Sequence, residues 1–550
     1  MTVLPRKQQF RRVALLALAA LLLHLVMIQP NHPAAMTWGA LFLFPLELPA
    51  VLLGLLALGL GRWGRLFRLF LTISLTIIVV WKVADVTMFT ALNRGFNPLT
   101  DMSLVTAFLN LISGTFGTVV AVLAVIGSII VTVLVAFTLW WACTTWLKLD
   151  AAGPMQNVVA IGAVLGTCLA IADAGHTMRA WTLPANPPGS AFTARLGAER
   201  IGLIRRTLGN IRNFQAAVAQ DIYADQDGLL DLIDRDVFVI FVESYGRTSF
   251  DTPQYADLHL ETLKTAQADL EDRGLAMAST FLKSPTRGGQ SWLAHATFAN
   301  GLWVTDQPSY GAVLSSGRQT LFHIAQNAGF QTAAIMPQIT LAWPESATMG
   351  FDTILAAADL GYEGAPFNWV TMPDQFTFAA MDRILGSSQS DGRPLFVQIA
   401  LGSSHAPWVP VPDLIPWEDI GNGTIYDPIV AASDTPEVVW KDHDRVRTQY
   451  GLAVDYALQS VFAYIALHAE QAPLILVIGD HQAAGFVALD ERPDVPIHVI
   501  GPDHLVALIA NDGFHAGLFP PEDTKAASME DMRALILQAF SSEIPKDETP

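Results

Sequence analysis

The sequence predicts a protein of two parts: an N-terminal bundle of five transmembrane helices and a C-terminal α/β domain outside the cytoplasm. Two observations support this fold class. The 550 residues are 52% hydrophobic and only 15% charged, which is too apolar for a soluble chain of this length. The apolar residues form long Leu, Val, Ile and Ala runs up to about residue 175, whereas the remainder has the composition of a globular protein.

Five stretches reach the roughly 20 apolar residues that a helix needs to cross a bilayer. Basic residues precede the first stretch, as in a secretory signal, but no small-residue cleavage pattern follows it, and more spans come directly after. We therefore interpret it as an uncleaved helix. The five stretches cover residues 13–29, 38–60, 67–89, 117–141 and 157–174.

Basic residues in the short loops orient these helices, because Lys and Arg concentrate on the cytoplasmic side. With the N-terminus inside, the outer loops hold only Arg94. An odd number of spans then places the chain beyond about residue 175 outside the cytoplasm. The sequence thus predicts a multi-pass protein of the cytoplasmic membrane with its C-terminal domain in the periplasm. The inner segments hold Arg6, Lys7, Arg11, Arg12, Arg62, Arg65, Arg68 and Lys148.

Three charged residues fall within or near the ends of the spans, where charge is costly. Lys82 and Asp85 are three residues apart on one helix face, so they either pair with each other or extend to the outer interface. Glu47 either makes an interhelical hydrogen bond or helps to hold a lipid headgroup.

The C-terminal part is acidic and contains no cysteine. Residues 1–150 carry ten Lys or Arg and four Asp or Glu, whereas the other 400 residues carry 22 and 46. Such a domain is a poor candidate for binding nucleic acid through bulk charge. Both cysteines, Cys143 and Cys168, lie in the apolar part, which excludes a disulfide framework from the C-terminal domain.

We expect the transmembrane spans in residues 1–175, a linker with amphipathic helices in residues 176–233, and the C-terminal domain in residues 234–545. In the domain, continuous apolar runs alternate with helical segments, which is typical of parallel strands covered on both faces. The expected strands are residues 236–243, 331–336, 394–401, 473–480 and 495–501.

Polar residues follow three of these strands, where an open α/β sheet places its ligand site. Glu243 ends the first strand, Asp480 and His481 follow "PLILVIG", and His405 lies beyond "PLFVQIAL". Between them, Ser291 in "TRGGQSWLAHAT" stands at the head of an expected helix, where its hydroxyl would act as a cap, as a nucleophile, or as both.

These residue types are chemically consistent with phosphoryl or sulfuryl transfer. Two carboxylates and one imidazole suit a divalent cation of the Mn, Mg and Zn group. Such a cation would lower the pKa of the Ser291 hydroxyl, and the helix N-terminus would face an anionic group. His405 would then protonate a leaving alkoxide or bind an oxygen of the substrate. Gly288 and Gly289 would let the backbone approach a bound phosphate.

The order of these motifs resembles the alkaline phosphatase superfamily, and more narrowly the sulfatase-like membrane transferases. That group includes lipoteichoic acid synthase and the phosphoglycerol transferases of periplasmic glucans. Their architecture of five membrane helices, a linker and an extracytoplasmic α/β domain covers nearly the whole chain. The further supporting motifs are "SSHAPW", "MPDQ" (372–375), "GFDTIL" (350–355) and "YGLAVDYALQ" (450–459).

The resemblance implies one divalent metal, manganese in the lipoteichoic acid relatives, bound by Glu243, Ser291, Asp480 and His481. It implies that Ser291 replaces the usual threonine nucleophile and that His405 binds substrate. Trp343 matches a residue that holds glycerol phosphate in those relatives. Met336 and Glu345 stand where the relatives have a histidine and an arginine.

Two further residues are candidates for substrate binding. Arg247, four residues after Glu243, would act as a phosphate clamp in place of the missing arginine, or would be a surface or ion-paired residue. His295 lies one helical turn beyond Ser291 and would line the pocket or simply pack in the core.

The resemblance and the site together favour a metal-dependent transferase. It would move a phosphoglycerol- or phosphoethanolamine-like headgroup from a membrane phospholipid to an envelope glycan or lipid through a covalent Ser291 intermediate. One alternative is an extracytoplasmic phosphodiesterase or sulfuric ester hydrolase of the same superfamily, and another is a non-catalytic envelope binding protein. Formylglycine sulfatases are set aside because "KSPTRGG" lacks their motif. Lipid A phosphoethanolamine transferases typically carry disulfides, which this domain cannot form.

Overall fold

The computed structural model describes residues 6–542 except 93, 150, 152, 186, 225, 342, 368–370, 389–391 and 511–512. It divides into two compact units, residues 1–210 and 211–550, here called the membrane unit and the outer unit. The expected linker, residues 176–233, is shared between the two. The last residues of the expected C-terminal domain, 543–545, lie outside the described part.

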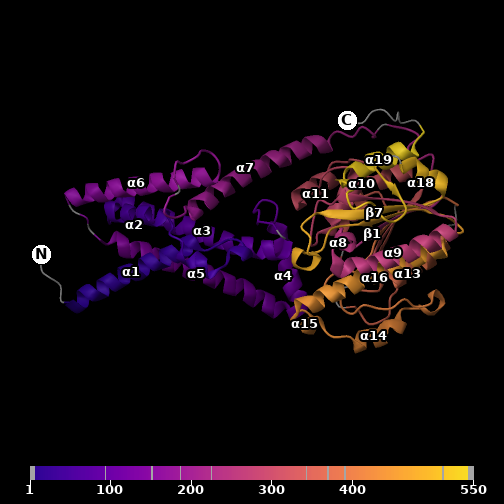
Figure 1. The fold of residues 1–550 in the computed structure, drawn as a ribbon, viewed down its shortest axis with the longest axis horizontal. Coiled ribbons are helices and arrows are strands. Elements are labelled where there is room, and N and C mark those ends of the chain that lie inside the picture. The colour runs from indigo at the N-terminus through magenta and orange to yellow at the C-terminus, as the bar shows by residue number, and fades with distance from the viewer. Residues whose placement is uncertain are drawn as a thin grey trace. The chain divides into compact units, whose positions relative to one another are not determined.

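Each of the five expected spans corresponds to a helix of the membrane unit (Figure 1). Four of these helices are long and apolar enough to cross a membrane. The helix of the second span has only 12 residues, because Pro45 favours extended backbone before it and interrupts the apolar run. The five helices are α1 (Arg6–Ile28), α2 (Glu47–Leu58), α3 (Arg62–Leu92), α5 (Thr118–Leu147) and α6 (Pro154–Thr177).

The membrane unit also contains α4 (Met102–Phe116), which the sequence analysis missed, and the first part of α7 (Phe192–Val218). α7 corresponds to the expected amphipathic helix of the linker. Its N-terminal residues lie in the membrane unit, where they contact the charged residues of the spans.

Lys82 and Asp85 do not pair with each other, contrary to one of the two expectations. Lys82 Nζ donates to the carbonyl oxygens of Val26 (3.0 Å) and Met27 (3.1 Å), at the C-terminal end of α1. A cation at this position satisfies carbonyl groups that have no partner within the helix. Asp85 instead forms an ion pair with Arg200 of α7.

Two carboxylates hold the N-terminus of α7. Glu47 Oε1 accepts from the amide of Ala194 (2.8 Å), and Asp173 Oδ2 accepts from the amide of Ala191 (2.7 Å). Negative charge at a helix N-terminus is favourable, since the free amides and the helix dipole point toward it. Of the two expectations for Glu47, the interhelical hydrogen bond is therefore the one that the structure contains.

The outer unit is built on one mixed sheet, of which Figure 1 labels β1 and β7. The strand order is β4-β3-β5-β1-β6-β7-β2-β8, with β9 paired to β2. β4, β3, β5, β1 and β6 are parallel. The strands are β1 (Val237–Val242), β2 (Ala276–Lys283), β3 (Gln331–Met336), β4 (Thr353–Ala356), β5 (Leu395–Ala400), β6 (Leu474–Gly479), β7 (Asp494–Gly501), β8 (His515–Ala516) and β9 (Ala527–Ser528).

All five expected strands are present, but β7 is antiparallel to β6 and not parallel as expected. The sequence analysis also missed β2, which is antiparallel to β7. Because β7 is antiparallel both to β6 and to β2, β2 runs in the same direction as β6. The C-terminal ends of β1, β5, β6 and β2 therefore lie at one edge of the sheet, which we call the carboxyl edge.

Helices cover both faces of this sheet, because the strand residues alternate between two apolar cores. On β1, Phe238, Ile240 and Val242 pack with α9 (Pro253–Asp272), α13 (Asp374–Ser388) and α16 (His443–Leu467). Val237, Val239 and Phe241 face the helices α10 (Ser291–Asn300), α12 (Leu321–Asn327), α18 (Asp503–Ile509) and α19 (Asp531–Phe540). α16 is also long and apolar enough to cross a membrane, but it is largely buried inside the outer unit.

Candidate active site at the carboxyl edge

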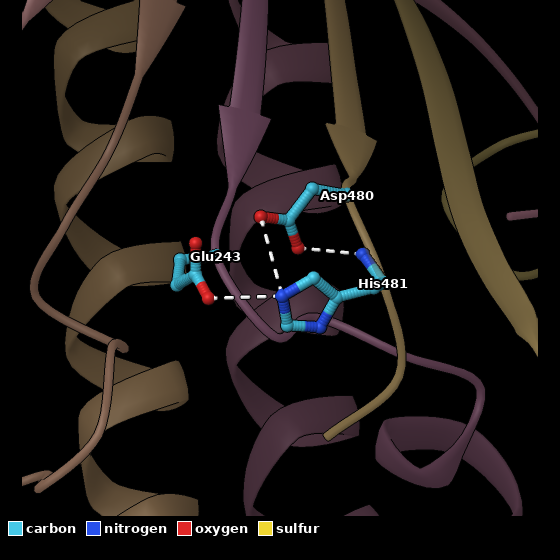
Figure 2. A group of neighbouring side chains, drawn as sticks. All are labelled: Glu243, Asp480 and His481. Atoms are coloured by element: carbon cyan, nitrogen blue, oxygen red, sulfur yellow. Dashed lines mark hydrogen bonds and ion pairs between the residues drawn. The ribbon is translucent and has the colours of Figure 1, made fainter. Parts of the chain in front are cut away.

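Glu243, Asp480 and His481 meet at the carboxyl edge (Figure 2). Glu243 follows β1 and the other two follow β6, and these strands are adjacent and parallel. His481 Nε2 lies 3.1 Å from Glu243 Oε1 and 3.9 Å from Asp480 Oδ2. All three residues are buried, with exposed fractions of 6%, 1% and 1%. Two carboxylates and an imidazole are thus concentrated where no bulk water surrounds them.

Local hydrogen bonds orient each of these side chains. Asp480 Oδ1 accepts from the amides of Ser244 (2.8 Å) and His481 (2.6 Å), which leaves Oδ2 facing the cluster. His481 Nδ1 lies 3.1 Å from the carbonyl oxygen of Gln482, so a proton on Nδ1 leaves Nε2 as the ligand atom. Ser404 Oγ donates to the carbonyl oxygen of Glu243 (2.6 Å) and links the β5 loop to β1.

The three groups strongly influence one another's protonation. Burial alone would lower the pKa of His481, but Asp480 and Glu243 outweigh burial and raise that pKa to about 9. Burial raises the pKa of Asp480 well above its usual range, and the Glu243 carboxylate raises it further. Burial opposes ionisation of Glu243, but His481 and His405 hold its pKa below the usual range. Such opposed shifts are typical of a buried functional site.

The donor set fits a divalent cation. One ligand atom from each of Glu243, Asp480 and His481 can be chosen so that all lie within 4.8 Å of one another. A cation would compensate the two buried carboxylates, which otherwise rely on a single imidazole. This buried triad could therefore bind a metal ion, with two oxygen ligands and one nitrogen ligand.

Ser291 is the first residue of α10, and its hydroxyl points into the triad. Ser291 Oγ donates to Glu243 Oε2 (2.7 Å) and lies 3.4 Å from His481 Nε2. The N-cap position is occupied by Gln290, which makes no side-chain capping bond. The expected cap role of Ser291 is therefore wrong, because its hydroxyl is committed to Glu243 and does not bind the helix amides.

The loop before Ser291 is fixed to the end of β6. The amide of Gly288 donates to the carbonyl oxygen of Gln482 (2.8 Å), and Ser284 Oγ donates to that of Asp480 (2.6 Å). Gly288 and Gly289 have φ angles of 73° and 135°, which only glycine adopts without strain. Gln290 is also left-handed, at 69°, so backbone strain is held directly before the hydroxyl.

His405 lies on the loop after β5. Its Nδ1 is 2.5 Å from the carbonyl oxygen of Ala406, which leaves Nε2 as the other functional nitrogen. Its charge is close enough to lower the pKa of Glu243. His405 thus lies in the electrostatic neighbourhood of the triad.

Asp374, in the "MPDQ" motif, holds the loop that carries His405. Asp374 Oδ1 accepts from the amides of Gly402 (2.8 Å) and Ser403 (2.9 Å), and Ser403 Oγ accepts from the Asp374 amide (2.9 Å). Burial raises the pKa of this carboxyl to about 6 against the effect of these bonds. The sequence identifies the motif but no role for Asp374, because the amides that Asp374 binds lie near residue 402.

Arg247 does not line the site, so its expected role as a phosphate clamp is not supported. It is buried, and its guanidinium pairs with Asp251 (2.9 Å) and Asp494 (3.4 Å). It also donates to the carbonyl oxygens of Thr524 and Glu522 and lies over the ring of Phe281. These contacts occupy its donors, which corresponds to the ion-paired alternative.

His295 is buried against Phe241, with ring centroids 4.1 Å apart. Burial lowers the pKa of His295 to about 4, so the ring is neutral at pH 7. Among the described residues, no partner hydrogen-bonds its Nε2. The charges of Glu243 and His481 also affect this pKa, so the ring lies close to the triad. His295 thus packs in the core, as one expectation states, and borders the site, as the other states.

Trp343 lies after β3, where it is half-buried and precedes a short 3-10 helix, η3 (Pro344–Thr348). It lies near Tyr310 of α11 (Gln307–Leu314): burial raises the pKa of Tyr310, and Trp343 lowers it. Met336 ends β3, and its sulfur contacts Gln398 Nε2 (3.9 Å).

The outer unit thus combines a mixed α/β sheet, a buried triad of metal-ligand type and a serine hydroxyl at the head of a helix. Residues 235–496 match the Sulfatase family, which confirms the sulfatase-like part of the predicted resemblance. No curated protein matches the chain in sequence.

Several solved structures are similar in fold. Lipooligosaccharide phosphoethanolamine transferase A of Neisseria meningitidis matches with 13% identity and a TM-score of 0.48, over 96% of this chain and 95% of that one. The lipoteichoic acid synthase LtaP of Listeria monocytogenes matches with 11% identity and a TM-score of 0.37, over 61% and 78%. The phosphoglycerol transferase GacH of Streptococcus pyogenes, in complex with sn-glycerol-1-phosphate, matches with 14% identity and a TM-score of 0.34, over 61% and 92%.

Proposed function

We propose that the protein transfers a phospho-headgroup from a membrane phospholipid to an envelope glycan or lipid through a covalent intermediate on Ser291. The observation that carries this proposal is the position of Ser291 Oγ, 2.7 Å from Glu243 Oε2 at the mouth of the buried triad. An ordinary helix cap would hydrogen-bond backbone amides. This hydroxyl instead faces groups that can activate it.

In the first half-reaction, Ser291 Oγ, oriented by its hydrogen bond to Glu243 Oε2, attacks the phosphorus of the lipid and releases its proton to solvent, while Glu243 stays ionised. The bond from phosphorus to the diacylglycerol oxygen breaks, and that oxygen takes a proton from His405. The headgroup phosphate is now esterified to Ser291, and diacylglycerol leaves.

In the second half-reaction, a hydroxyl of the acceptor attacks the same phosphorus and passes its proton to His405. The bond between Ser291 Oγ and phosphorus breaks, and the serine takes a proton back from solvent. Every group of the protein returns to its starting state. The N-terminal amides of α10 face the phosphate oxygens through both halves, which favours the added negative charge.

We propose that Glu243, Asp480, His481 and Ser291 hold one divalent cation, for which the resemblance suggests manganese. When bound, such an ion supplies charge stabilisation and lowers the pKa of the Ser291 hydroxyl. The loop bonds from Gly288 and Ser284 to the end of β6 keep the serine aligned with the other three ligands.

The proposed setting is the cytoplasmic membrane, with the N-terminus inside and residues 234–545 as a periplasmic catalytic domain joined by the linker. The apolar helices of the membrane unit support it, because a lipid donor requires the catalytic domain to stay at the bilayer surface. The acidic outer domain carries no thiols, so its fold does not depend on periplasmic disulfide formation.

The match to the Sulfatase family supports one alternative, a hydrolase in which water takes the place of the acceptor. Product analysis separates the two functions. Full-length protein is incubated with Mn²⁺ and vesicles of headgroup-labelled phosphatidylethanolamine and phosphatidylglycerol, together with an envelope extract. We expect diacylglycerol and a labelled acceptor, both absent with Ser291→Ala. Free headgroup phosphate as the sole labelled product would instead establish the hydrolase.

A further inference from the structure

Trp440 lies beside the turn that carries His405. Its ring stacks on the ring of Trp408, with centroids 5.7 Å apart and planes at 4°. Its indole nitrogen donates to the carbonyl oxygen of Pro407 (3.2 Å), two residues after His405. Trp408 is itself buried, and its indole nitrogen donates to the carbonyl oxygen of Ser404 (2.8 Å). Trp440 is therefore attached to the loop after β5 both by its ring and by its N–H group.

Two further rings extend this surface. Phe486 lies in α17 (Gly485–Ala488), on the segment that follows the triad residues of β6, and its ring centroid is 6.2 Å from that of Trp440. His443, the first residue of α16, lies against Phe486 with centroids 5.5 Å apart. Arg447 Nε donates to the carbonyl oxygen of Phe486 (3.0 Å), which holds α17 on α16. We call Trp440, Phe486 and His443 the aromatic platform.

The central ring of the platform is fixed in place although it is exposed. Trp440 follows α15 (Pro436–Val439), which buried Val439 attaches to the core of the outer unit. The indole is nevertheless 41% exposed, and because Trp408 covers one face, the exposed area belongs to the other face and the edges. An aromatic ring that is already immobilised loses little conformational entropy when a ligand binds. Such a ring at the rim of a site is typical of a recognition surface.

The chemistry of the platform fits a sugar ring. The face of an indole carries the negative part of the ring quadrupole, which attracts C–H groups of partial positive charge. A pyranose presents several such C–H groups on one face and hydroxyl groups around its edge. The exposed imidazole of His443 both donates and accepts hydrogen bonds, so it suits those hydroxyl groups.

The charge around the platform disfavours an anionic ligand or an anionic bilayer surface. Residues 434–447 carry four carboxylates and three basic residues. Arg445 pairs with Asp434 (2.5 Å). Arg447 pairs with Asp444 (2.8 Å). Binding to anionic lipid relies on an excess of Lys and Arg, which this surface lacks. A neutral, hydroxylated ring is therefore the ligand that the described contacts favour.

We propose that the aromatic platform binds a pyranose ring of the acceptor, so that the acceptor is a glycan and not a lipid. The inference rests on the proposed function, since it assigns the acceptor of the same site. In the second half-reaction a hydroxyl of the bound glycan forms the new bond to phosphorus and passes its proton to His405, while the bond to Ser291 Oγ breaks. The attachment of Trp440 to Pro407 places the platform next to the residue that receives this proton.

The test separates the two half-reactions. Full-length protein with Mn²⁺ and vesicles of headgroup-labelled phosphatidylethanolamine or phosphatidylglycerol is given maltopentaose, cellopentaose, chitopentaose or free glycerol as acceptor. We expect a higher kcat/KM for at least one pentasaccharide than for glycerol. Trp440→Ala should raise the KM for that pentasaccharide about tenfold, a larger change than in the rate of diacylglycerol release during the first turnover.

Two results would overturn the assignment. One is transfer to glycerol that is as efficient as transfer to every pentasaccharide. The other is a Trp440→Ala variant whose first turnover slows as much as its use of the sugar, because the platform would then contact the donor or the bilayer.

Matched variants assign the effect to the ring itself. Trp440→Phe keeps an aromatic face, so the KM for the pentasaccharide should rise less than in Trp440→Leu. Val438→Ala alters a residue of α15 that is also 41% exposed and should leave this KM unchanged. The melting temperature and bound manganese of each variant control for folding. Equal values in the Phe and Leu variants, or an equal effect of Val438→Ala, would exclude a stacking role.

Binding without chemistry distinguishes failure of the platform from failure of the proposed function. Saturation-transfer difference NMR of the three pentasaccharides is recorded with full-length Ser291→Ala protein in lipid nanodiscs. We expect transfer to the sugar C–H protons and its loss when Trp440→Ala is added. If the proposed function fails, wild-type protein forms no adduct on Ser291 from either lipid. If only the platform fails, the adduct forms, but sugar binding is absent or does not depend on Trp440.

Discussion

The membrane unit and the outer unit both bury carboxylates, but they compensate the charge in opposite ways. In the membrane unit, Glu47 and Asp173 accept from amides at the N-terminus of α7, and Asp85 pairs with Arg200. At the carboxyl edge, Glu243 and Asp480 lie together with a single imidazole between them. In the first arrangement backbone amides or an arginine hold each carboxylate, whereas the second concentrates two carboxylates around one imidazole, a donor set that suits a cation.

This difference distinguishes buried charges that stabilise the fold from buried charges that serve a reaction. A buried carboxylate whose partners are backbone amides or an arginine fastens elements together and needs no ligand. Two buried carboxylates that repel each other destabilise the fold and persist where they serve a reaction. Removing a buried carboxylate should therefore change the melting temperature in opposite directions in the two units.

The largest effect is expected in the membrane unit. Asp85→Ala leaves the Arg200 guanidinium and the Asn31 amide without their shared acceptor, in a place where the carboxylate is fully buried. Breaking a buried pair in this way costs about 3 kcal/mol or more. The thermal unfolding midpoint of the detergent-solubilised protein should drop by several degrees. Glu199→Gln, on the exposed side of α7, breaks only the half-exposed pair with Arg195 (3.6 Å) and, as the control, should shift it little.

The opposite sign is expected at the triad. Asp480→Asn keeps an oxygen for the amides of Ser244 and His481 but removes the repulsion with Glu243. The metal-free protein, measured in chelator, should melt at a higher temperature than wild type. The rise in melting temperature on adding Mn²⁺ should shrink or vanish. A variant that melts lower than wild type in chelator would mean that the triad is a structural network like that of the membrane unit.

A smaller effect is expected from the residue that positions His405. Asp374→Ala removes the acceptor for the amides of Gly402 and Ser403, so the β5 loop loses its anchor. We expect kcat for diacylglycerol release to fall about tenfold or more while bound manganese is retained. Asp374→Asn keeps the acceptor oxygen and should recover most of the rate. Loss of metal in both variants would place Asp374 in a different role.

The smallest effect concerns a buried histidine remote from the reaction. His498 on β7 contacts Tyr245 Oη (3.0 Å) and Ser279 Oγ (2.7 Å), and burial lowers its pKa to about 3. The unfolded chain binds a proton on this ring near pH 6.5, whereas the folded chain does not. Stability is therefore full above pH 6.5 and is lost as the pH falls toward 3, by about 1 kcal/mol at pH 5.5.

Denaturant unfolding between pH 5 and 8 measures this slope, and His498→Asn should reduce it, while His295, whose pKa burial also lowers, keeps its own share. An equal slope in the variant would assign the acid sensitivity to other groups. The pH range avoids titration of most carboxylates, whose usual pKa values lie lower.

The sequence predicts the five spans, the main parallel strands and the residues of the triad, because apolar runs and polar strand ends are local signals. It does not predict the direction of β7 or the presence of β2, since strand pairing depends on contacts between distant segments. Arg247 shows the same limit. Its spacing from Glu243 suggested the site, but Asp251, Asp494 and two carbonyl groups, three of them distant in sequence, bind its guanidinium.

The sequence also does not predict the partners of Lys82 and Asp85. Three-residue spacing suggested a pair, yet each finds a stronger partner from another helix: the end of α1 for Lys82 and Arg200 for Asp85. The role of Asp374 depends on a loop near residue 402, which no local pattern connects to "MPDQ".

Mass spectrometry of the Ser291 peptide tests the central claim most directly. Full-length protein is incubated with Mn²⁺ and vesicles of phosphatidylethanolamine or of phosphatidylglycerol, without acceptor, then quenched in acid and digested. We predict that the peptide gains the mass of a phosphoethanolamine or a phosphoglycerol group, and that omission of Mn²⁺ or the Asp480→Asn substitution removes the adduct. Release of diacylglycerol with an unmodified Ser291 at every quench time, or an adduct on another residue, would contradict the account.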